Sequence, residues 1–245
     1  MKIDRPTPAQ IPQLRQLWQE AFGDTDAFLD SFFSAAFSPS RCLCATIGCA
    51  VAAAAYWFSC GEYAYIYAVA TAKAFRGRGI CHALMEKIHE ILTKQGYAGC
   101  ILVPGSAGLR QFYSGMGYRS FGGVQEFTCE AGTPLSITKI DPNEFAVLRR
   151  QYLPAGGMIQ EAENLAFLSC LAEFYRGDDF LLTAALDGDT LHGMELLGNA
   201  DAAAGIVAAL GAKRGAFRKP GDTPFAMHLP LNEKKVPGYF GFAFD

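Results

Sequence analysis

The sequence has no excess of basic residues. Lysine and arginine number 21 against 24 aspartates and glutamates, which gives a formal net charge of −3 and a pI near 5.8. A nucleic-acid-binding domain usually carries a basic field, so this class of function is disfavoured. Charged residues make up only 18% of the chain, whereas hydrophobic residues make up 51%. A chain of 245 residues with this composition can bury a sizeable core, as one large domain or two small ones.

The sequence also lacks any Cys-x-x-Cys pair, although it contains eight cysteines. The spacing of Cys42, Cys44 and Cys49 fits no zinc motif, and none of the four histidines stands at ligand spacing from a cysteine. We therefore expect no metal site. The opening MKIDRPTPAQ carries no apolar signal segment. We interpret the cysteines as free, buried thiols of a protein in the reducing cytoplasm.

Residues 42–61 contain no charge, and a run of this length could cross a membrane as a helix. Gly48 interrupts the run, and a second uncharged stretch at 63–72 follows after Glu62 alone. One residue cannot join two membrane spans. Buried strands joined by tight turns explain both runs better, so we expect no membrane association.

Hydrophobic periodicity predicts strands and helices in alternation over the first half of the chain. After a short strand at KIDRPT, the predicted elements are helices over about 9–22 and 26–36 and strands near 41–47, 50–59 and 62–71. Tyr63, Tyr65, Tyr67 and Val69 are expected to share one face of the last strand, because successive side chains alternate.

A crossover unit follows these strands. An amphipathic helix is predicted from Ile80 to about residue 95, and a strand over 97–103. Strands joined through a helix in this way are usually parallel neighbours, which we expect here for 62–71 and 97–103. A short helix over about 108–115 and a strand from Tyr118 complete the first half.

The segment Arg76-Gly77-Arg78-Gly79-Ile80 joins the strand to the helix. Glycines let a backbone approach a phosphate closely, and a helix N-terminus offers free N–H donors. Lys73 and the two arginines add positive charge. The segment is neither a GxGxxG fingerprint nor a Walker A loop. The alternative interpretation is a tight turn with solvated arginines.

Four segments occur in a characteristic order around this loop: Val69-Ala70-Thr71, Arg76-Gly77-Arg78-Gly79-Ile80 before a helix, a strand ending at Pro104, and Leu109-x-x-Phe112-Tyr113-x-x-Met116-Gly117-Tyr118. Together they resemble the GNAT superfamily of acyl-CoA-dependent N-acetyltransferases. The resemblance covers roughly the first 125 residues. It implies an α/β (α+β) fold with a mixed central sheet flanked by helices.

The resemblance also implies roles for individual residues. Val69, Ala70 and Thr71 match the end of the strand whose backbone pairs with the pantetheine arm of acetyl-CoA, and this strand bulges in the family. Arg76, Gly77, Arg78, Gly79, Ile80 and Cys81 match the pyrophosphate-binding loop. Tyr113 matches the tyrosine that protonates the departing thiolate. A bulged-strand amide near Val69 and Ala70 is the natural donor to the oxyanion.

Cys81 departs from the family pattern, since the last loop position is usually glycine or alanine. A thiol at a helix N-terminus beside arginines is expected to have a lowered pKa. It would crowd the pyrophosphate slightly or make binding sensitive to oxidation; the alternative is a tolerated small residue. Lys73, where proline is frequent, is a second and minor departure.

The general base is less clearly marked than the acid. An amine with a pKa near ~10 must lose a proton before it attacks a thioester. Glu62 is the candidate base, with a solvated turn residue as its alternative. Tyr65 and Tyr67 could hold a water chain, but an aromatic stripe is more often core. His82 and His89 are interpreted as surface or packing residues.

The second half repeats a similar order of elements. We predict a strand at 135–140, helices at 141–153, 161–174 and 201–212, a hairpin of FLLTAAL and TLHGMELL around Asp187-Gly188-Asp189, and final strands PFAMHLPL and GYFGFAFD. No glycine-rich loop precedes 201–212. We therefore expect a smaller, shortened GNAT-like unit without cofactor binding, the alternative being an unrelated α+β extension.

These observations predict a GNAT N-acetyltransferase domain at 1–130 that binds acetyl-CoA, and a C-terminal α+β domain at 131–245. The expected activity is transfer of an acetyl group to a primary amine by direct attack in a ternary complex. The acceptor would be a small-molecule or peptide amine. The alternatives are a non-catalytic acyl-CoA-binding sensor or module, and a partner-binding protein that uses the apolar second half.

Overall fold

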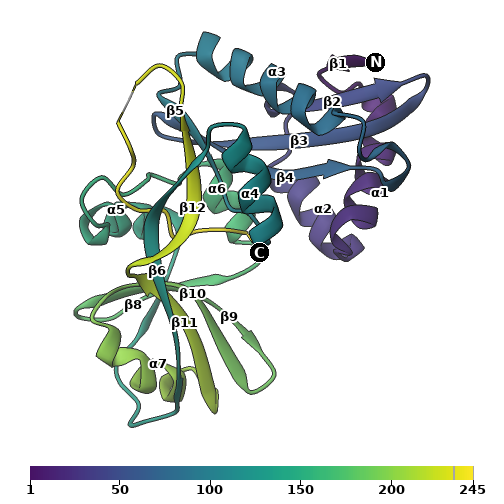
Figure 1. Cartoon of the computed structure of the whole chain (residues 1–245). Helices are drawn as coiled ribbons and strands as arrows, with labels where there is room; N and C mark the ends of the chain where they lie inside the picture. The colour runs from purple at the N-terminus through teal and green to yellow at the C-terminus, as the bar shows by residue number, and fades with distance from the viewer. Residues whose placement is uncertain (234, 245) are drawn as a thin grey trace. The chain divides into compact units, whose positions relative to one another are not determined.

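The computed structural model describes residues 1–233 and 235–244 (Figure 1). The chain divides into two compact units, each built from two segments. Unit 1 comprises Met1–Arg119 with Met227–Val236, and unit 2 comprises Ser120–Ala226 with the stretch from Pro237 onward. The predicted division at residue 130 differs from this one, because a C-terminal strand belongs to the sheet of unit 1.

The sheet of unit 1 has the strand order β1-β2-β3-β4-β5-β12, and only the β4–β5 pair is parallel. The parallel crossover predicted from the sequence is therefore confirmed. The uncharged runs form β2, β3 and β4. The strands are β1 (Lys2–Asp4), β2 (Cys42–Ile47), β3 (Ala50–Cys60), β4 (Tyr63–Thr71), β5 (Gly99–Leu102) and β12 (Thr223–Pro230), of which Met227–Pro230 pair with β5.

Helices cover both faces of this sheet (Figure 1). On one face, α3 (Ile80–Lys94) packs its apolar stripe on small strand residues such as Ala53 and Ala64, and α4 (Ala107–Gly115) adds Tyr113 to the same core. On the other face, α1 (Ile11–Phe22) and α2 (Asp26–Ala35) bring aromatic rings onto β3 and β4. Trp18 lies at the centre of this aromatic cluster and is 2% exposed.

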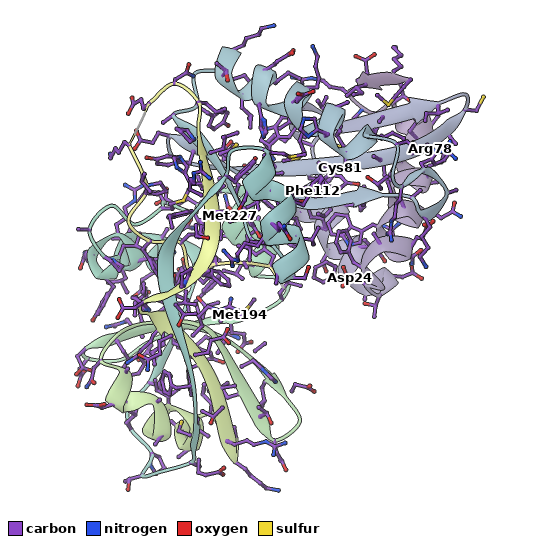
Figure 2. The ribbon with its side chains drawn as sticks, viewed as in Figure 1. Asp24, Arg78, Cys81, Phe112, Met194 and Met227 are labelled. Atoms are coloured by element: carbon purple, nitrogen blue, oxygen red, sulfur yellow. The ribbon has the colours of Figure 1, made fainter. Side chains whose placement is uncertain are left out.

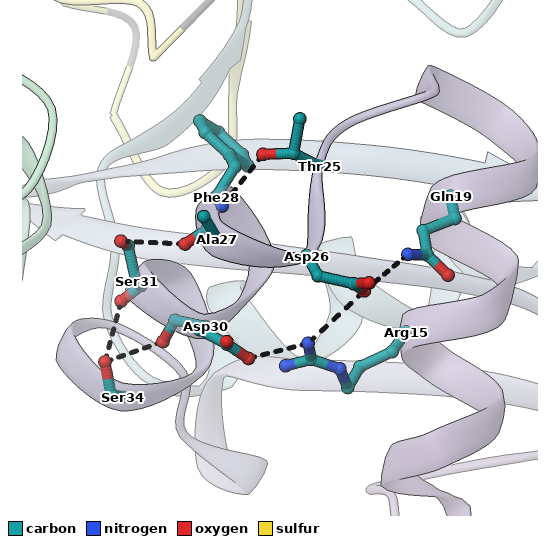
Figure 3. Close-up of polar contacts among 9 residues, drawn as sticks. All are labelled: Arg15, Gln19, Thr25, Asp26, Ala27, Phe28, Asp30, Ser31 and Ser34. Atoms are coloured by element: carbon teal, nitrogen blue, oxygen red, sulfur yellow. Dashed lines mark hydrogen bonds and ion pairs between the residues drawn. The ribbon is translucent and has the colours of Figure 1, made fainter.

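The loop between α1 and α2 is fixed by polar contacts (Figure 3). The Thr25 hydroxyl caps α2 by accepting a hydrogen bond from the Phe28 amide at 3.2 Å. Arg15 of α1 pairs with Asp30 of α2 at 2.7 Å, and the Gln19 amide donates to Asp26 at 2.7 Å. The loop is therefore held at both of its ends.

Strand β4 contains a bulge that the alternation rule did not predict. Tyr56 pairs with Tyr67 and Ala54 with Ala70, so β4 has one residue more than β3 between these pairs. Ala68 takes a left-handed conformation there, with φ of 48°. The bulge reverses the following side chains: Tyr67 contacts the aromatic cluster, whereas Val69 packs against the α3 core. The expectation that Val69 shares a face with the tyrosines is wrong.

Unit 2 has the strand order β7-β8-β9-β10-β11-β6, and here only β10–β11 is parallel. Its elements are β6 (Arg119–Glu130), β7 (Thr138–Ile140), α5 (Pro142–Tyr152), α6 (Glu163–Leu168), β8 (Glu173–Arg176), β9 (Phe180–Asp187), β10 (Thr190–Gly198), α7 (Ala203–Ala209) and β11 (Arg214–Pro220). This is the strand pattern of unit 1, with the parallel pair in the same place. The expected repeat of elements is confirmed.

Three predictions for unit 2 need correction. The helix expected to reach residue 174 ends at Leu168, because Phe174 pairs in β8 and its ring packs against Phe145 with the ring centroids 4.3 Å apart. The strand β11 was not predicted. The segment GYFGFAFD is irregular from Gly238 to Phe244 rather than a strand, and its aromatic rings fill the core; Asp245 lies outside the described residues.

All eight cysteines are free thiols. Cys42, Cys44, Cys60 and Cys100 are buried as expected, but Cys49 and Cys170 are exposed. Among the residues that the structure describes, no helix combines the length and the hydropathy needed to span a membrane, and no three metal-ligating side chains converge.

Candidate functional site

The loop before α3 exposes its backbone. Gly77 and Gly79 have φ of 74° and 71°, a region that side-chain-bearing residues rarely adopt, and no atom lies within 4 Å of the position that a Cβ would take on either residue. Arg76 and Arg78 are exposed on either side of Gly77. An anion could therefore approach the loop backbone without steric hindrance.

The N-terminus of α3 is not capped by a side chain. Its N-cap is Gly79, whereas Thr25, Ser106 and Asp141 cap α2, α4 and α5 through their side-chain oxygens. The first-turn N–H groups of α3 thus have no intrahelical acceptor and point outward. The positive end of the helix dipole adds to their attraction for an anion.

The carboxyl end of β4 lies directly before this loop. The Arg76 Nε donates a hydrogen bond to the Thr71 carbonyl at 3.0 Å, which ties the loop to the strand. Strand β4 pairs with β5 only over Tyr63–Tyr65, and from there to Thr71 it pairs with β3 alone. The two strands therefore separate, and Val69, Ala70 and Thr71 border an opening through the sheet.

Three of the predicted residues converge on this opening. Thr71 ends β4, Cys81 lies in the first turn of α3, and the Cys81 thiol forms a side-chain hydrogen bond with Thr71. Tyr113 of α4 is close enough to Cys81 for an electrostatic interaction. Figure 2 shows Cys81 and the neighbouring Phe112 on the two helices that cover this side of β4.

Burial raises the pKa of the Tyr113 hydroxyl well above its ordinary value, and the neighbouring Cys81 raises it further. The phenol therefore stays protonated at neutral and moderately alkaline pH. A protonated hydroxyl at the opening between the strands is a potential proton donor.

The prediction of an acidic Cys81 thiol is wrong. Burial raises its pKa to about 11, and the hydrogen bond from Thr71 compensates only in part. Burial disfavours the charged thiolate, and this effect is the largest one on the Cys81 thiol. Cys81 is therefore a protonated packing residue at neutral pH.

Tyr118 packs against Tyr113, and His89 in turn contacts Tyr118. The Tyr118 ring lies 5.8 Å from the Tyr113 ring, and its amide donates to the Tyr113 carbonyl at 3.1 Å. The Tyr118 hydroxyl contacts His89 Nε2 at 2.8 Å and Cys100 Sγ at 3.2 Å. His89 is therefore a packing residue, as expected, while His82 is exposed and lies 3.3 Å from Glu86.

His89 should make stability fall at acidic pH. Burial, with a smaller contribution from His82, lowers its pKa from 6.5 to about 4, so the folded protein favours neutral His89. This stabilisation is complete above pH 6.5 and is lost as pH falls towards 4, by about 1–3 kcal/mol. His89→Gln should flatten the fall in Tm measured between pH 7 and 4, whereas His82→Gln should not. Equal slopes in all three proteins would contradict the assignment.

Glu62 does not lie with these residues. It occupies the β3–β4 turn, where its carboxylate pairs with Lys235 at 3.1 Å. Glu62 and Ala70 are eight positions apart along an extended chain, or roughly 26 Å. This placement does not support Glu62 as a base. Tyr65 and Tyr67 also belong to an aromatic cluster rather than a water chain, since Tyr65 stacks on Phe58 and Tyr67 meets Trp18 edge to face.

Two features of this region have no local sequence signal, although the family resemblance implied a bulge in this strand. The Ala68 bulge carries no glycine that would signal a positive φ. Two carboxylates on α1 and the loop after it also lie close by: Glu20 accepts a hydrogen bond from the Lys73 amide at 2.6 Å, and Asp24 accepts one from Trp18 Nε1 at 2.7 Å. Their spacing from the loop motif, about 50 residues, offers no local signal.

Unit 2 lacks the corresponding loop. The connection after β10 runs through Asn199, whose side chain accepts a hydrogen bond from the Asp201 amide at 3.0 Å. Asn199 thus caps the short 3-10 turn Ala200–Ala202 that leads into α7, and no glycine-rich loop stands there as it does before α3.

Comparison with known proteins finds a matching family model and solved structures of similar fold. The model of the GNAT acetyltransferase domain matches residues 2–121. No curated protein matches the sequence. A GCN5-related N-acetyltransferase from Kribbella flavida superposes with a TM-score of 0.72 at 18% identity, covering 94% of this chain and 71% of its own. Eis1 from Mycobacterium abscessus superposes with a TM-score of 0.70 at 12% identity, and the match covers 95% of this chain and 74% of Eis1. At such identities the structures show a shared fold, and the shared fold extends over both units.

Proposed function

Since residues 2–121 of the chain belong to the GNAT acetyltransferase family, we propose that the protein transfers the acetyl group of acetyl-CoA to a primary amine. The observation that carries this proposal is the convergence of Thr71, Cys81 and Tyr113 at the opening between β4 and β5, beside an uncapped helix N-terminus. An acyltransferase needs these features together: an anion cradle, a free strand edge and a proton donor.

The loop fits the pyrophosphate of acetyl-CoA. The first-turn amides from Ile80 onward, the backbone of Gly77 and Gly79, and the guanidinium groups of Arg76 and Arg78 would hold the two phosphates. Neither arginine forms an ion pair with a described residue, so both are available to an anion. The unpaired edge of β4 at Val69–Thr71 would hydrogen-bond the pantetheine arm, as an added strand would.

The same residues would act on the reacting groups. An amide of the bulge at Val69 or Ala70 would donate a hydrogen bond to the carbonyl oxygen of the thioester as negative charge develops there. Tyr113 would give its proton to the departing sulfur. The amine must be neutral to attack, and water can accept its proton at the opening.

A substitution at Gly79 tests the proposed pyrophosphate-binding loop directly. A valine there would be strained at φ of 71° and would place methyl groups over the first-turn amides. Gly79→Val should raise the KM for acetyl-CoA at least about 10-fold, with a smaller change in kcat. Gly48→Val is the matched control, because Gly48 has φ of 60°, open surroundings and a place in the distant β2–β3 turn. An unchanged KM in Gly79→Val would exclude this loop as the phosphate site.

A transferase releases CoA when it acetylates an amine, whereas the alternative, a non-catalytic acyl-CoA sensor, binds acetyl-CoA without releasing CoA. Purified protein is incubated with acetyl-CoA and a panel of primary amines, and free thiol is measured alongside Tm. The transferase releases CoA in the presence of at least one amine. If acetyl-CoA raises the Tm while no amine releases CoA, the chain is a binding module rather than an enzyme.

A further inference from the structure

A cavity of about 550 Å³ opens at the C-terminal end of α3, whereas the candidate site lies at the N-terminal end of the same helix. Its lining includes Gln95 and Gly96, which follow the helix, and Gly61 and Glu62 of the β3–β4 turn. The 15 residues of α3 (Figure 1) separate the two places by roughly 22 Å. The cavity is therefore distinct from the loop before α3, and its volume is in the range of small-molecule sites.

Two arginines from neighbouring strands of unit 1 line this cavity. Arg5 directly follows β1, and Arg41 directly precedes β2. Leu43 and Trp57 belong to the core under α3, so strand alternation puts Arg41 on the same face of the sheet. The half-buried Arg41 side chain is held there, because its Nη2 donates to the Ala36 carbonyl at 3.3 Å. Trp57, which is 3% exposed, closes the cavity towards the core.

The carboxylates near these arginines have other partners. Asp4 pairs with Lys2 at 2.7 Å. Glu62, the acidic residue of the cavity lining, pairs with Lys235 at 3.1 Å. Arg5 forms no hydrogen bond or ion pair within residues 1–233 and 235–244. The cavity thus has an excess of positive charge, in a chain whose formal net charge is −3.

The end of α3 offers little repulsion to an anion. The carbonyls of a last helical turn carry partial negative charge. Here the Leu92 carbonyl accepts a hydrogen bond from the Tyr97 amide at 3.1 Å, and the Thr93 carbonyl accepts one from the Asn232 side chain at 2.9 Å. The exposed Gln95 side chain forms no hydrogen bond within the described part of the chain, so its amide can donate to a ligand.

We propose that this cavity binds a small organic anion, a phosphate monoester or a dicarboxylate, whose anionic group is held between Arg5 and Arg41. A guanidinium presents paired N–H donors that match phosphate and carboxylate oxygens, so both kinds of ligand share one recognition chemistry. The Gln95 amide donates to a further polar atom of the ligand. Because the cavity and the loop before α3 share no residue, the anion and acetyl-CoA should bind at the same time.

The two tryptophans of the chain allow a test that reads this cavity directly. Trp57 lines the cavity, whereas Trp18 lies in the aromatic cluster on the other face of the sheet. Full-length protein labelled with fluorotryptophan is titrated with inorganic phosphate and, separately, with succinate at constant ionic strength. The two fluorine resonances are assigned by the loss of one signal in Trp57→Phe or in Trp18→Phe. At least one anion should shift the Trp57 resonance in a saturable way and leave the Trp18 resonance in place, and the anion that binds more tightly distinguishes phosphorylated from dicarboxylic ligands.

Substitutions of the arginines locate the bound anion. Arg41→Gln should raise the Kd of the preferred anion about 10-fold or more, because charge-assisted hydrogen bonds are lost. Arg5→Gln changes an exposed side chain, which leaves the fold intact, and should raise the Kd at least about 3-fold. Arg78→Gln is the matched control: Arg78 is an exposed arginine of the loop before α3, and its loss should keep the wild-type Kd.

Three results would overturn the inference. The first is the absence of a saturable shift of the Trp57 resonance with either anion, and the second is an equal rise in Kd in Arg5→Gln and Arg78→Gln. The third is displacement of the anion by saturating CoA, which would place it in the loop before α3. The proposed transferase function is tested separately, because none of these measurements depends on the release of CoA from acetyl-CoA.

Discussion

Replacing Tyr113 with phenylalanine is expected to lower kcat about 100-fold or more while changing the KM for acetyl-CoA little. The hydroxyl is the only part removed, and the ring continues to pack in the α3–α4 core, where Tyr113 is 6% exposed. General acid catalysis typically contributes about 10²–10⁴-fold to a rate. The loss should therefore be concentrated in the chemical step, and steady-state kinetics with saturating amine would measure it.

The choice of leaving group provides an internal check. If Tyr113 protonates the departing sulfur, the defect of Tyr113→Phe should shrink with an acyl thioester whose thiol is more acidic, since such a thiolate needs no proton to leave. Tyr97→Phe is the matched control: the Tyr97 hydroxyl contacts Ser59 at 2.7 Å, next to the β3–β4 turn, and its loss should leave turnover intact. A Tyr113→Phe enzyme with wild-type kcat would remove Tyr113 from the acid role.

Ending the chain after residue 130 is expected to prevent unit 1 from folding, although the GNAT match ends at residue 121. The fragment lacks Met227–Pro230, which pair with all four residues of β5. Loss of this part of β12 would expose the edge of β5, which is otherwise paired, to solvent. Met227 is fully buried, and the burial of one such side chain contributes about 1.5–3 kcal/mol, a large part of the net stability of a domain.

The fragment should aggregate or lack a cooperative thermal transition by circular dichroism. A matched variant joins residues 1–118 to residues 223–236 through a flexible Gly/Ser linker and so returns the missing strand. This second protein should be monomeric by size-exclusion chromatography and should melt cooperatively. Cooperative folding of residues 1–130 alone would show that β12 is dispensable to unit 1.

Local patterns predicted the elements around the loop because those elements depend on nearby residues. The helix from Ile80 carries a regular apolar stripe, and the glycines at 77 and 79 mark the turn before it. The bulge at Ala68 was implied only by the family resemblance, because it is defined by register against β3 rather than by composition. Strand β11 escaped because Arg214, Arg218 and Lys219 interrupt its hydrophobic pattern.

The parts of the candidate site that lie in local sequence motifs were predicted. The contacts between residues far apart in the sequence were not. Arg76 to Cys81 and Tyr113 belong to motifs with fixed spacing. Tyr118 is part of the quoted motif, but its contact with His89 joins residues that no spacing rule relates, as does the contact of Asp24 with Trp18. The pKa of Cys81 also depends on burial by the tertiary structure, which reversed the direction expected from its neighbours in sequence.

The last strand of each sheet comes from the other half of the sequence: β6 follows α4 yet pairs with β11, and β12 follows β11 yet pairs with β5. Two separate copies of a one-unit ancestor could make the same pairings by trading their last strands as a dimer. Gene duplication and fusion would then preserve that trade within one chain. Recombination could not later part the two halves without leaving both sheets one strand short.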